Sequence, residues 1–211
     1  LEQLLPAPTK LRTLKHHAAL DWREAPAFMT ALDAMDGVAA RALAFAILTA
    51  ARSGQVRGMT WREIDGDVWI VPAGRMKADK EHRVPLVPAA LALLGDRRKG
   101  HDLVFESPAK VERALSDMAL TAVLRRLGHG ELTVHGFRST FRDWAGETSS
   151  HPREVIEAAL AHRLKDKAEA AYARGDLFVK RRRLMADWAN FLSTTLGEIL
   201  TLAPAEDRQA G

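Results

Sequence analysis

The sequence predicts a mostly helical α+β fold with one small antiparallel β-sheet or hairpin near its N-terminal third. Helical periodicity of apolar residues recurs along most of the chain. Short β-rich segments interrupt it only between Trp61 and Leu86, and no internal repeat or low-complexity tract is present. A length of 211 residues suits a single domain with a full core.

Two helices are expected before the β-rich region. The first 20 residues show no clean period and contain two prolines, so they read as a linker. Apolar residues at helical spacing predict a helix from Pro26 to Met35, which Gly37 ends. The next helix begins at about Val38 and is apolar nearly all round, which predicts that it is buried.

The β-rich region contains two candidate strands, Val68–Val71 and His82–Leu86, separated by glycine and proline. Helices are then predicted at residues 88–94, 116–127, 137–146, 152–160, 167–174 and 178–202. Because the chain opens on Leu1 and not on Met, we expect a piece of a longer polypeptide. The expected organisation is a linker from an upstream domain at 1–21, the folded domain at 22–202 and a flexible tail at 203–211.

Composition narrows the range of functions. Lys and Arg number 31 against 27 Asp and Glu, a mildly basic balance that favours a polyanionic partner. The chain has no cysteine, which excludes disulfides, thiolate zinc sites, iron–sulfur clusters and cysteine nucleophiles, and favours a reducing compartment. The longest uncharged apolar run, Ala42–Ala51, is half the roughly 20 residues that a membrane span needs. We therefore expect neither membrane insertion nor secretion.

Four residues in the second half of the chain suggest phosphate chemistry. Tyr172 is the only tyrosine, and by itself it would read as a half-buried packing residue on an alanine-rich helix. His162 closes an apolar helix ten residues earlier. His135 and Arg138 are three residues apart, so they share a helix face. Such a pair is either an ordinary surface pair or a set of donors suited to a phosphate.

Two basic residues of the first half have the same ambiguity. Arg52 follows the buried second helix in LTAARSGQ. It reads either as a cation at that helix's C-terminus or as a guanidinium held at the floor of a cleft. Lys77 lies between the candidate strands in MKADKEHRVPL, where it either keeps a sheet edge charged or approaches a ligand.

The ordered segments LTAARSGQ, MKADKEHRVPL, HGFR, LAHR and AAYAR resemble the catalytic domain of tyrosine recombinases, most closely the integrases of phages and genomic islands. The resemblance covers about residues 22 to 193. It implies that Arg52 and Arg138 are the two arginines that clamp the phosphate and that Lys77 is the lysine of the hairpin. It also implies that His135 and His162 are the paired histidines and that Tyr172 is the nucleophile. Two departures, Gln55 where Glu is common and Ser139 where His is frequent, fall outside these six positions.

The chemistry that the resemblance implies is attack of Tyr172 on a DNA phosphodiester, giving a 3′-phosphotyrosyl link and a free 5′-hydroxyl. A phenol with a pKa near 10 needs a base, for which His135 is the candidate. Lys77 is the candidate acid for the leaving 5′-oxygen, and the arginines with His162 stabilise the phosphate charge. No metal, cofactor or ATP is implied. The sequence also lacks the carboxylate cluster of two-metal nucleases and the phosphate-binding loop GxxxxGK[ST].

The resemblance also implies partners: double-stranded DNA at attachment or core sites, further recombinase subunits in a tetramer, and excision or host DNA-bending factors. It places the protein in the bacterial cytoplasm, at the nucleoid when on DNA, and within a prophage or other mobile element. Basic residues beyond the six are candidate DNA contacts, namely Lys80, Arg83, Arg181 and Arg182. The last two also fit a solvated helix face. The apolar stripe of that final helix either covers its own domain or docks on a neighbouring subunit.

Three other functions share some of these sequence features. A type IB topoisomerase would resemble this sequence at the same residues, although LAHR and AAYAR favour an integrase. A catalytically silent DNA-binding module is disfavoured because all six positions are filled. A metal site made of histidines is disfavoured because the candidate residues are not spaced in the sequence as metal ligands are. These residues are His16, His17, His129 and His151.

Overall fold

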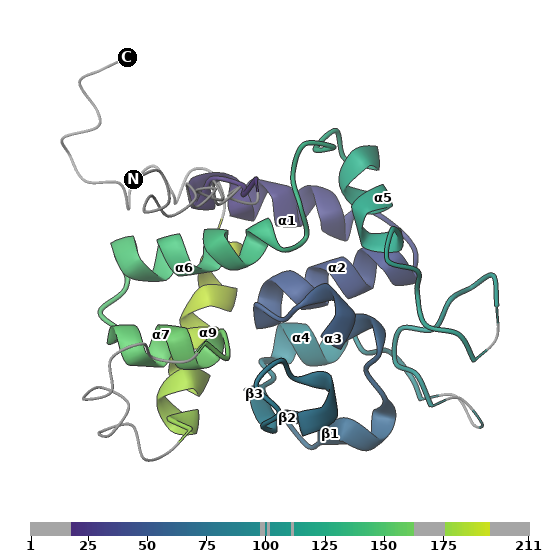
Figure 1. Ribbon diagram of the computed structural model, residues 1–211. Coiled ribbons are helices and arrows are strands. Elements are labelled where there is room, and N and C mark those ends of the chain that lie inside the picture. The colour runs from purple at the N-terminus through teal and green to yellow at the C-terminus, as the bar shows by residue number, and fades with distance from the viewer. Residues whose placement is uncertain (1–17, 98–99, 101, 111, 163–175, 195–211) are drawn as a thin grey trace, which may run out of the picture.

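The computed structural model describes residues 18–97, 100, 102–110, 112–162 and 176–194, and it confirms the mostly helical α+β fold with a small antiparallel sheet (Figure 1). The first elements are η1 (Trp22–Glu24), α1 (Ala25–Asp33), α2 (Val38–Thr49), α3 (Ser53–Arg57), η2 (Trp61–Glu63), β1 (Ile64–Asp65), β2 (Val68–Val71), η3 (Ala73–Arg75) and β3 (His82–Pro85). The later ones are α4 (Pro88–Ala92), α5 (Ala119–Arg126), α6 (Gly136–Thr148), α7 (Arg153–Ala159) and α9 (Phe178–Leu192). The helix predicted at 167–174 lies outside the described residues.

Helix α2 forms the centre of the core. It begins at Val38 as predicted, after Gly37, whose φ of 113° favours glycine. Every residue from Ala42 to Thr49 is buried, which agrees with its all-round apolar sequence. It packs against α1, α3, α4, α5, α6 and α9 (Figure 1). The C-terminal end of α2 is therefore a firmly packed point from which the candidate site is built.

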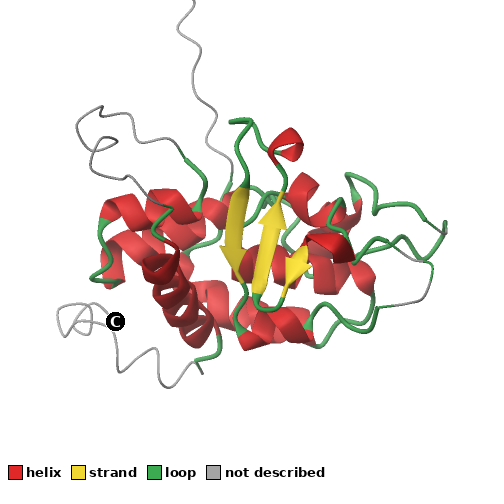
Figure 2. Ribbon diagram, turned by 90° about the horizontal axis from the view of Figure 1, so that it is seen from below, coloured by secondary structure: helices red, strands yellow, loops and turns green. Residues whose placement is uncertain are grey.

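The sheet has three antiparallel strands in the order β1-β2-β3 (Figure 2). In the register of β2 with β3, Val68 is opposite Pro85 and Val71 is opposite His82. Trp69 and Val71 are fully buried, whereas their β2 neighbours are only partly so, as expected for a strand that buries one face. The connection from β2 to β3 carries the MKADKE segment.

Helix α9 buries its apolar stripe within its own domain. Trp188 is fully buried, with its ring 4.9 Å from that of Trp144 and 5.5 Å from that of Phe141. Of the two predicted roles for this stripe, the structure therefore shows the intramolecular one. The helix ends at Leu192, so the predicted end near Leu202 was wrong. None of the described helices is both long enough and apolar enough to cross a membrane.

The last residues of the predicted linker pack on α6. Leu20 is buried, and its carbonyl accepts a hydrogen bond of 2.7 Å from the Thr140 hydroxyl. The Ala18 carbonyl oxygen lies 2.1 Å from the point where a Cβ on Gly136 would be. No side chain fits there, which explains the glycine of HGFR. This contact fixes the start of α6, where two of the candidate site residues are found.

Candidate active site

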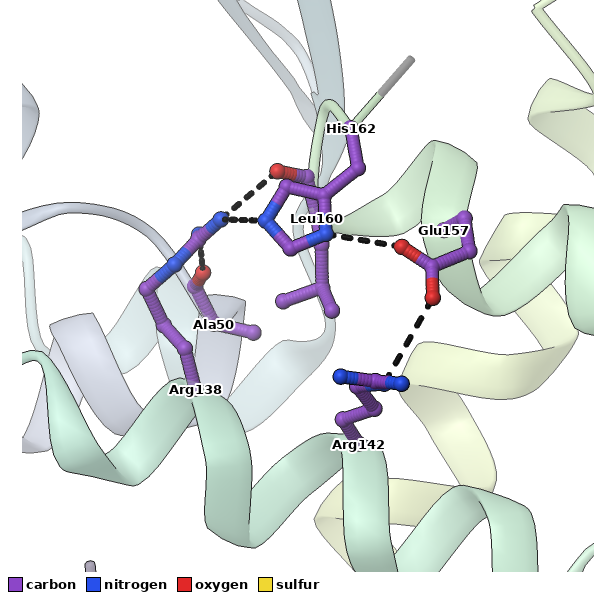
Figure 3. Close-up of polar contacts among 6 residues, drawn as sticks. All are labelled: Ala50, Arg138, Arg142, Glu157, Leu160 and His162. Carbon is purple, nitrogen blue, oxygen red and sulfur yellow. Dashed lines mark hydrogen bonds and ion pairs between the residues drawn. The ribbon is translucent and has the colours of Figure 1, made fainter. Parts of the chain in front are cut away.

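Arg138 is the central residue of the site. It lies in the first turn of α6, and only 5% of it is exposed. Its Nη1 donates to the carbonyl of Ala50, and its Nη2 donates to the carbonyl of Leu160 over 2.7 Å (Figure 3). Those carbonyls follow the C-terminal ends of α2 and α7, where helices leave acceptors without intrahelical partners. One guanidinium thus joins three helices.

The environment of Arg138 is strongly positive. Burial and, to a smaller extent, the nearby charge of Arg52 together lower the pKa of its guanidinium to about 9, although the charge of Glu157 acts in the opposite direction. At neutral pH the side chain still carries its charge. A buried cation of this kind, beside a second one, favours an anion at the site.

Arg52 differs from the predicted placement at the end of the buried second helix. That helix stops at Thr49 because Ala50 takes the left-handed conformation, with a φ of 50°, and its N–H caps the final turn. Arg52 is instead the extended N-cap residue of α3, a short helix that the sequence reading missed. The side chain is half-buried, and this burial lowers its pKa. Ala50 links the two arginines, since Arg138 holds its carbonyl.

Gln55 and Arg75 hold Arg52 against the β2–β3 connection. The backbone N–H of Arg52 donates to Gln55 Oε1 over 2.9 Å. Gln55 Nε2 in turn donates to the sulfur of Met76, the residue before Lys77. Arg75 Nη1 donates to the backbone carbonyl of Gln55 over 3.0 Å and forms an ion pair with Glu63. The side-chain amide of Gln55 thus accepts one hydrogen bond and donates another. These two contacts explain how Gln is accommodated at a position where the family commonly has Glu.

Lys77 lies in an exposed turn between η3 and β3. Within the described part of the chain, its ammonium has no hydrogen bond or ion pair. Its neighbour Met76 is buried, so the backbone beside Lys77 is anchored while the side chain extends from the surface. Lys80, the other lysine of this connection, is also exposed.

His162 follows α7, directly after Ala161, which has a φ of 50°. Its Nε2 lies 3.2 Å from Arg138 Nη2, and its Nδ1 lies 2.7 Å from Glu157 Oε2 (Figure 3). Burial lowers the pKa of the imidazole, Glu157 raises it, and Arg138 and Arg52 lower it. The structure therefore brings His162 and Arg138, which are 24 residues apart in the sequence, into contact.

His135 and Tyr172 complete the predicted set. His135 is the exposed N-cap residue of α6, and its carbonyl accepts from the Arg138 N–H over 3.1 Å. It occupies the same end of α6 as Arg138, as the three-residue spacing predicted. Tyr172 lies outside the described residues, between His162 and Asp176 in the sequence.

The four predicted DNA contacts do not share one environment. Lys80 and Arg83 are exposed, and Arg83 stacks over the Phe178 ring at 4.1 Å. Arg182 is partly buried and pairs with Asp67. Arg181 is only 1% exposed. Its Nε donates to the Asp176 carbonyl over 2.6 Å, and its Nη2 lies 3.2 Å from the Asp176 carboxylate. Arg181 is therefore no surface cation, because it anchors the start of α9 in the core.

Sequence reasoning missed Glu157 and His82. Glu157 stands five residues before His162, among the apolar residues of the sequence VIEAALA, and this acidic residue was the available signal. His82 lies on β3, and its imidazole hydrogen-bonds the backbone of Ala159 at the end of α7. Burial, followed by the charge of Arg181, lowers the pKa of His82 to about 4. Its position opposite Val71 in the sheet gave no hint of this contact, which joins the sheet to α7.

No group of carboxylates and histidines within the described ranges is arranged to hold a metal ion. His129 instead pairs with Glu131 at 3.5 Å, and His151 pairs with Asp187 at 2.6 Å. The alternative histidine metal site also included His16 and His17, which lie outside the described residues.

Comparison with known proteins identifies the family. The model of the phage integrase family matches residues 19–176. The prophage integrase IntA of Escherichia coli (strain K12) is 36% identical over 69% of this chain, and prophage integrase IntZ of the same strain is 33% identical over 91%. The chain spans 37% and 49% of the lengths of these relatives.

A solved structure has a similar fold. A crystal structure of a lambda integrase (75-356) dimer bound to a COC′ core site matches 82% of this chain and 63% of its own, with a TM-score of 0.53 and 19% identity. The family model matches most of the sequence, and the order of the motifs and the cationic site agree with that match. The chain therefore belongs to the phage integrase family.

Proposed function

We propose that this chain is the catalytic domain of a site-specific DNA recombinase, in which Tyr172 attacks a DNA phosphodiester. The observation that carries the proposal is the convergence of Arg138, His162 and Arg52 on one partly buried cationic site. A phosphodiester is the anion that suits this set, because guanidinium groups bind its non-bridging oxygens in a bidentate manner. Family membership supports the same conclusion.

In the proposed reaction, the phenol oxygen of Tyr172 forms a bond to phosphorus and the bond from phosphorus to the 5′-oxygen breaks. Negative charge grows on the non-bridging oxygens, where Arg52, Arg138 and His162 stabilise it. Arg138 suits this role because its two backbone contacts hold it in place before DNA arrives. A donor fixed in advance does not have to reorganise during the reaction.

Two proton transfers accompany the exchange of bonds. His135 takes the proton of the phenol, and Lys77 gives a proton to the departing 5′-oxygen. Both side chains are exposed, so both can reach a bound duplex. Because side chains supply the charge and the protons, we expect cleavage to proceed in EDTA and without ATP. Attack of another 5′-hydroxyl on the phosphotyrosyl bond reverses the chemistry and joins strands.

Double-stranded DNA is the proposed substrate, as the core-site complex of the lambda integrase supports. The cations proposed to follow the phosphates are the exposed Lys80 and Arg83 and the partly buried Arg182, which predicts weak and strongly salt-dependent binding. We propose residues 22–202 as the catalytic unit, acting in the bacterial cytoplasm with further subunits in a tetramer and with DNA-bending or excision factors. We propose that recognition of a particular site depends on regions like those of the relatives that this chain does not match, since the chain spans 37% and 49% of their lengths.

The test is covalent trapping on a nicked suicide duplex in EDTA, analysed on a denaturing gel. We expect a protein–DNA band with the wild-type chain and none with Tyr172→Phe, which keeps the ring and removes only the nucleophilic hydroxyl. A band of equal intensity in Tyr172→Phe, or binding of the duplex without any band, would contradict the proposal.

A further inference from the structure

Glu157 is a largely buried carboxylate that the proposed chemistry does not yet use. Its side chain is 13% exposed, and its Oε2 lies 2.7 Å from His162 Nδ1. Its Oε1 lies 3.5 Å from Arg142 Nε (Figure 3). The carboxylate therefore contacts His162 on the ring nitrogen that faces away from Arg138, and Arg142 holds it from α6.

These contacts determine the tautomer of His162. A guanidinium can only donate hydrogen bonds, so Nε2, which faces Arg138 Nη2 at 3.2 Å, is an acceptor without a proton. The proton of the neutral ring is then on Nδ1, where it is donated to Glu157. In this state His162 cannot donate from Nε2 to a phosphate oxygen.

Donation to phosphate requires a second proton on the ring. The resulting imidazolium would lie beside Arg138 and Arg52, both of which disfavour it. Arg142, on the far side of Glu157, adds a further positive charge, whereas His82 on β3 stays neutral above about pH 4. Glu157 is the residue whose charge opposes these effects, since it raises the pKa of His162.

We propose that Glu157 is the positioning residue for His162, fixing the tautomer with Nδ1 protonated in the free protein and stabilising the imidazolium that donates from Nε2 once a phosphodiester binds. The inference rests on the proposed function. The phosphodiester supplies the second negative charge, so binding is coupled to uptake of one proton from solvent by His162. Glu157 itself does not touch the substrate.

Three variants separate the contributions of Glu157. Glu157→Gln keeps a carbonyl oxygen that can accept from Nδ1–H but removes the charge, and Glu157→Ala removes both. Glu154→Gln makes the same chemical change one turn earlier on α7, away from His162, and serves as the matched control.

The state of His162 is measured by nitrogen-15 NMR of the full chain with labelled histidine, its signals assigned by their loss in His162→Gln. We expect the neutral ring to carry its proton on Nδ1 in wild type and Glu157→Gln. In Glu157→Ala, where only the Arg138 contact still favours that tautomer, we expect a larger share of the ring to carry the proton on Nε2. The pKa of His162 should fall in Glu157→Gln, because the carboxylate charge that raises it is removed, and stay unchanged in Glu154→Gln. A proton on Nε2 in the neutral wild-type ring, or an unchanged pKa in Glu157→Gln, would overturn the proposal.

Single-turnover cleavage gives the second readout. At saturating DNA, the rate of Glu157→Gln relative to wild type should be close to one at a pH low enough to protonate His162 in both DNA complexes. The relative rate should fall as the pH rises, because His162 of the variant loses its proton at lower pH. A relative rate that is equally low at every pH would indicate a structural defect and would overturn the proposal. If the wild-type chain forms no covalent complex at all, the proposed function fails, but the NMR result still decides the role of Glu157.

Discussion

The two sides of the candidate site are built in opposite ways. On the α6–α7 side, Arg138 and His162 are tied to backbone carbonyls, to a carboxylate and to each other. On the hairpin side, Lys77 is exposed, and no described residue pairs with its ammonium. The comparison teaches that the two proposed tasks have different structural needs. Stabilising charge requires donors that are already fixed, whereas delivering a proton requires a side chain that can reach the leaving oxygen.

The contrast also has an energetic side. Burying the Arg138 charge is costly, and the lowering of its pKa to about 9 reports that cost. The fold offsets it by using the same guanidinium to satisfy two buried carbonyls. Substitutions on this side should therefore affect stability and activity together, whereas substitutions at Lys77 should affect activity alone.

The largest effect is expected for Arg138→Ala. It leaves the carbonyls of Ala50 and Leu160 without their donors, at a cost of about 1–3 kcal/mol each in the free energy of unfolding. It also removes a donor to the phosphate, so the single-turnover cleavage rate should fall by roughly 10²–10³-fold. Urea unfolding and covalent trapping measure the two losses.

Arg138→Lys is the matched control, since it keeps the charge but lacks the planar fork that serves both carbonyls. We expect it to lose both stability and rate, less severely than the alanine variant. If Arg138→Lys had wild-type stability and rate, the positive charge alone would suffice, and the described geometry of the clamp would be irrelevant.

Lys77→Ala is expected to affect the rate alone. Loss of a general acid should slow cleavage of an ordinary phosphodiester by about 10²-fold or more. The free energy of unfolding should stay within roughly 0.5 kcal/mol of wild type, as for other exposed positions. Lys80→Ala, in the same exposed connection, should change salt-dependent DNA binding but leave the rate at saturating DNA unaltered. A loss of rate in Lys80→Ala with none in Lys77→Ala would exchange the two assignments.

The smallest effect at neutral pH is expected for His82, where the sheet meets α7. Unfolded His82 takes up a proton near its ordinary pKa of 6.5, whereas the folded chain keeps it neutral down to about pH 4. Its contribution to stability is thus fully present above pH 6.5 and is lost as the pH falls from 6.5 towards 4. In His82→Gln the free energy of unfolding should decline less steeply over this range. Parallel stability curves for the two proteins would show that His82 is not held neutral.

Much of this arrangement was predictable because local patterns carry it. The buried character of α2, the hairpin and the shared turn of His135 and Arg138 follow from spacing and apolar periodicity. The α6–α7 clamp was not predictable, because it depends on the backbone carbonyls of Ala50 and Leu160, which no residue type reveals. In the same way, Gly136 is explained only by the distant Ala18 carbonyl.

The misassigned positions have physical reasons as well. Arg181 was read as a surface cation from a run of basic residues, yet tertiary contacts with Asp176 and the Arg83 carbonyl bury it. Helix α3 was missed because five residues beginning with Ser53 and Gly54 give no helical periodicity. For Arg181 a long-range contact with the Arg83 carbonyl overrode the local pattern, whereas for α3 no local pattern was present.

The division of labour between the two sides is tested most directly by comparing cleavage of two suicide duplexes, one with the normal 5′-bridging oxygen and one with sulfur in its place. Sulfur leaves without needing a proton. Lys77→Ala should therefore cleave the sulfur duplex within about tenfold of wild type while remaining slow on oxygen, and Arg138→Lys should be slowed on both duplexes alike. If Lys77→Ala were slowed equally on both, Lys77 would not be the acid, and the proposed contrast between a fixed clamp and a free proton donor would be wrong.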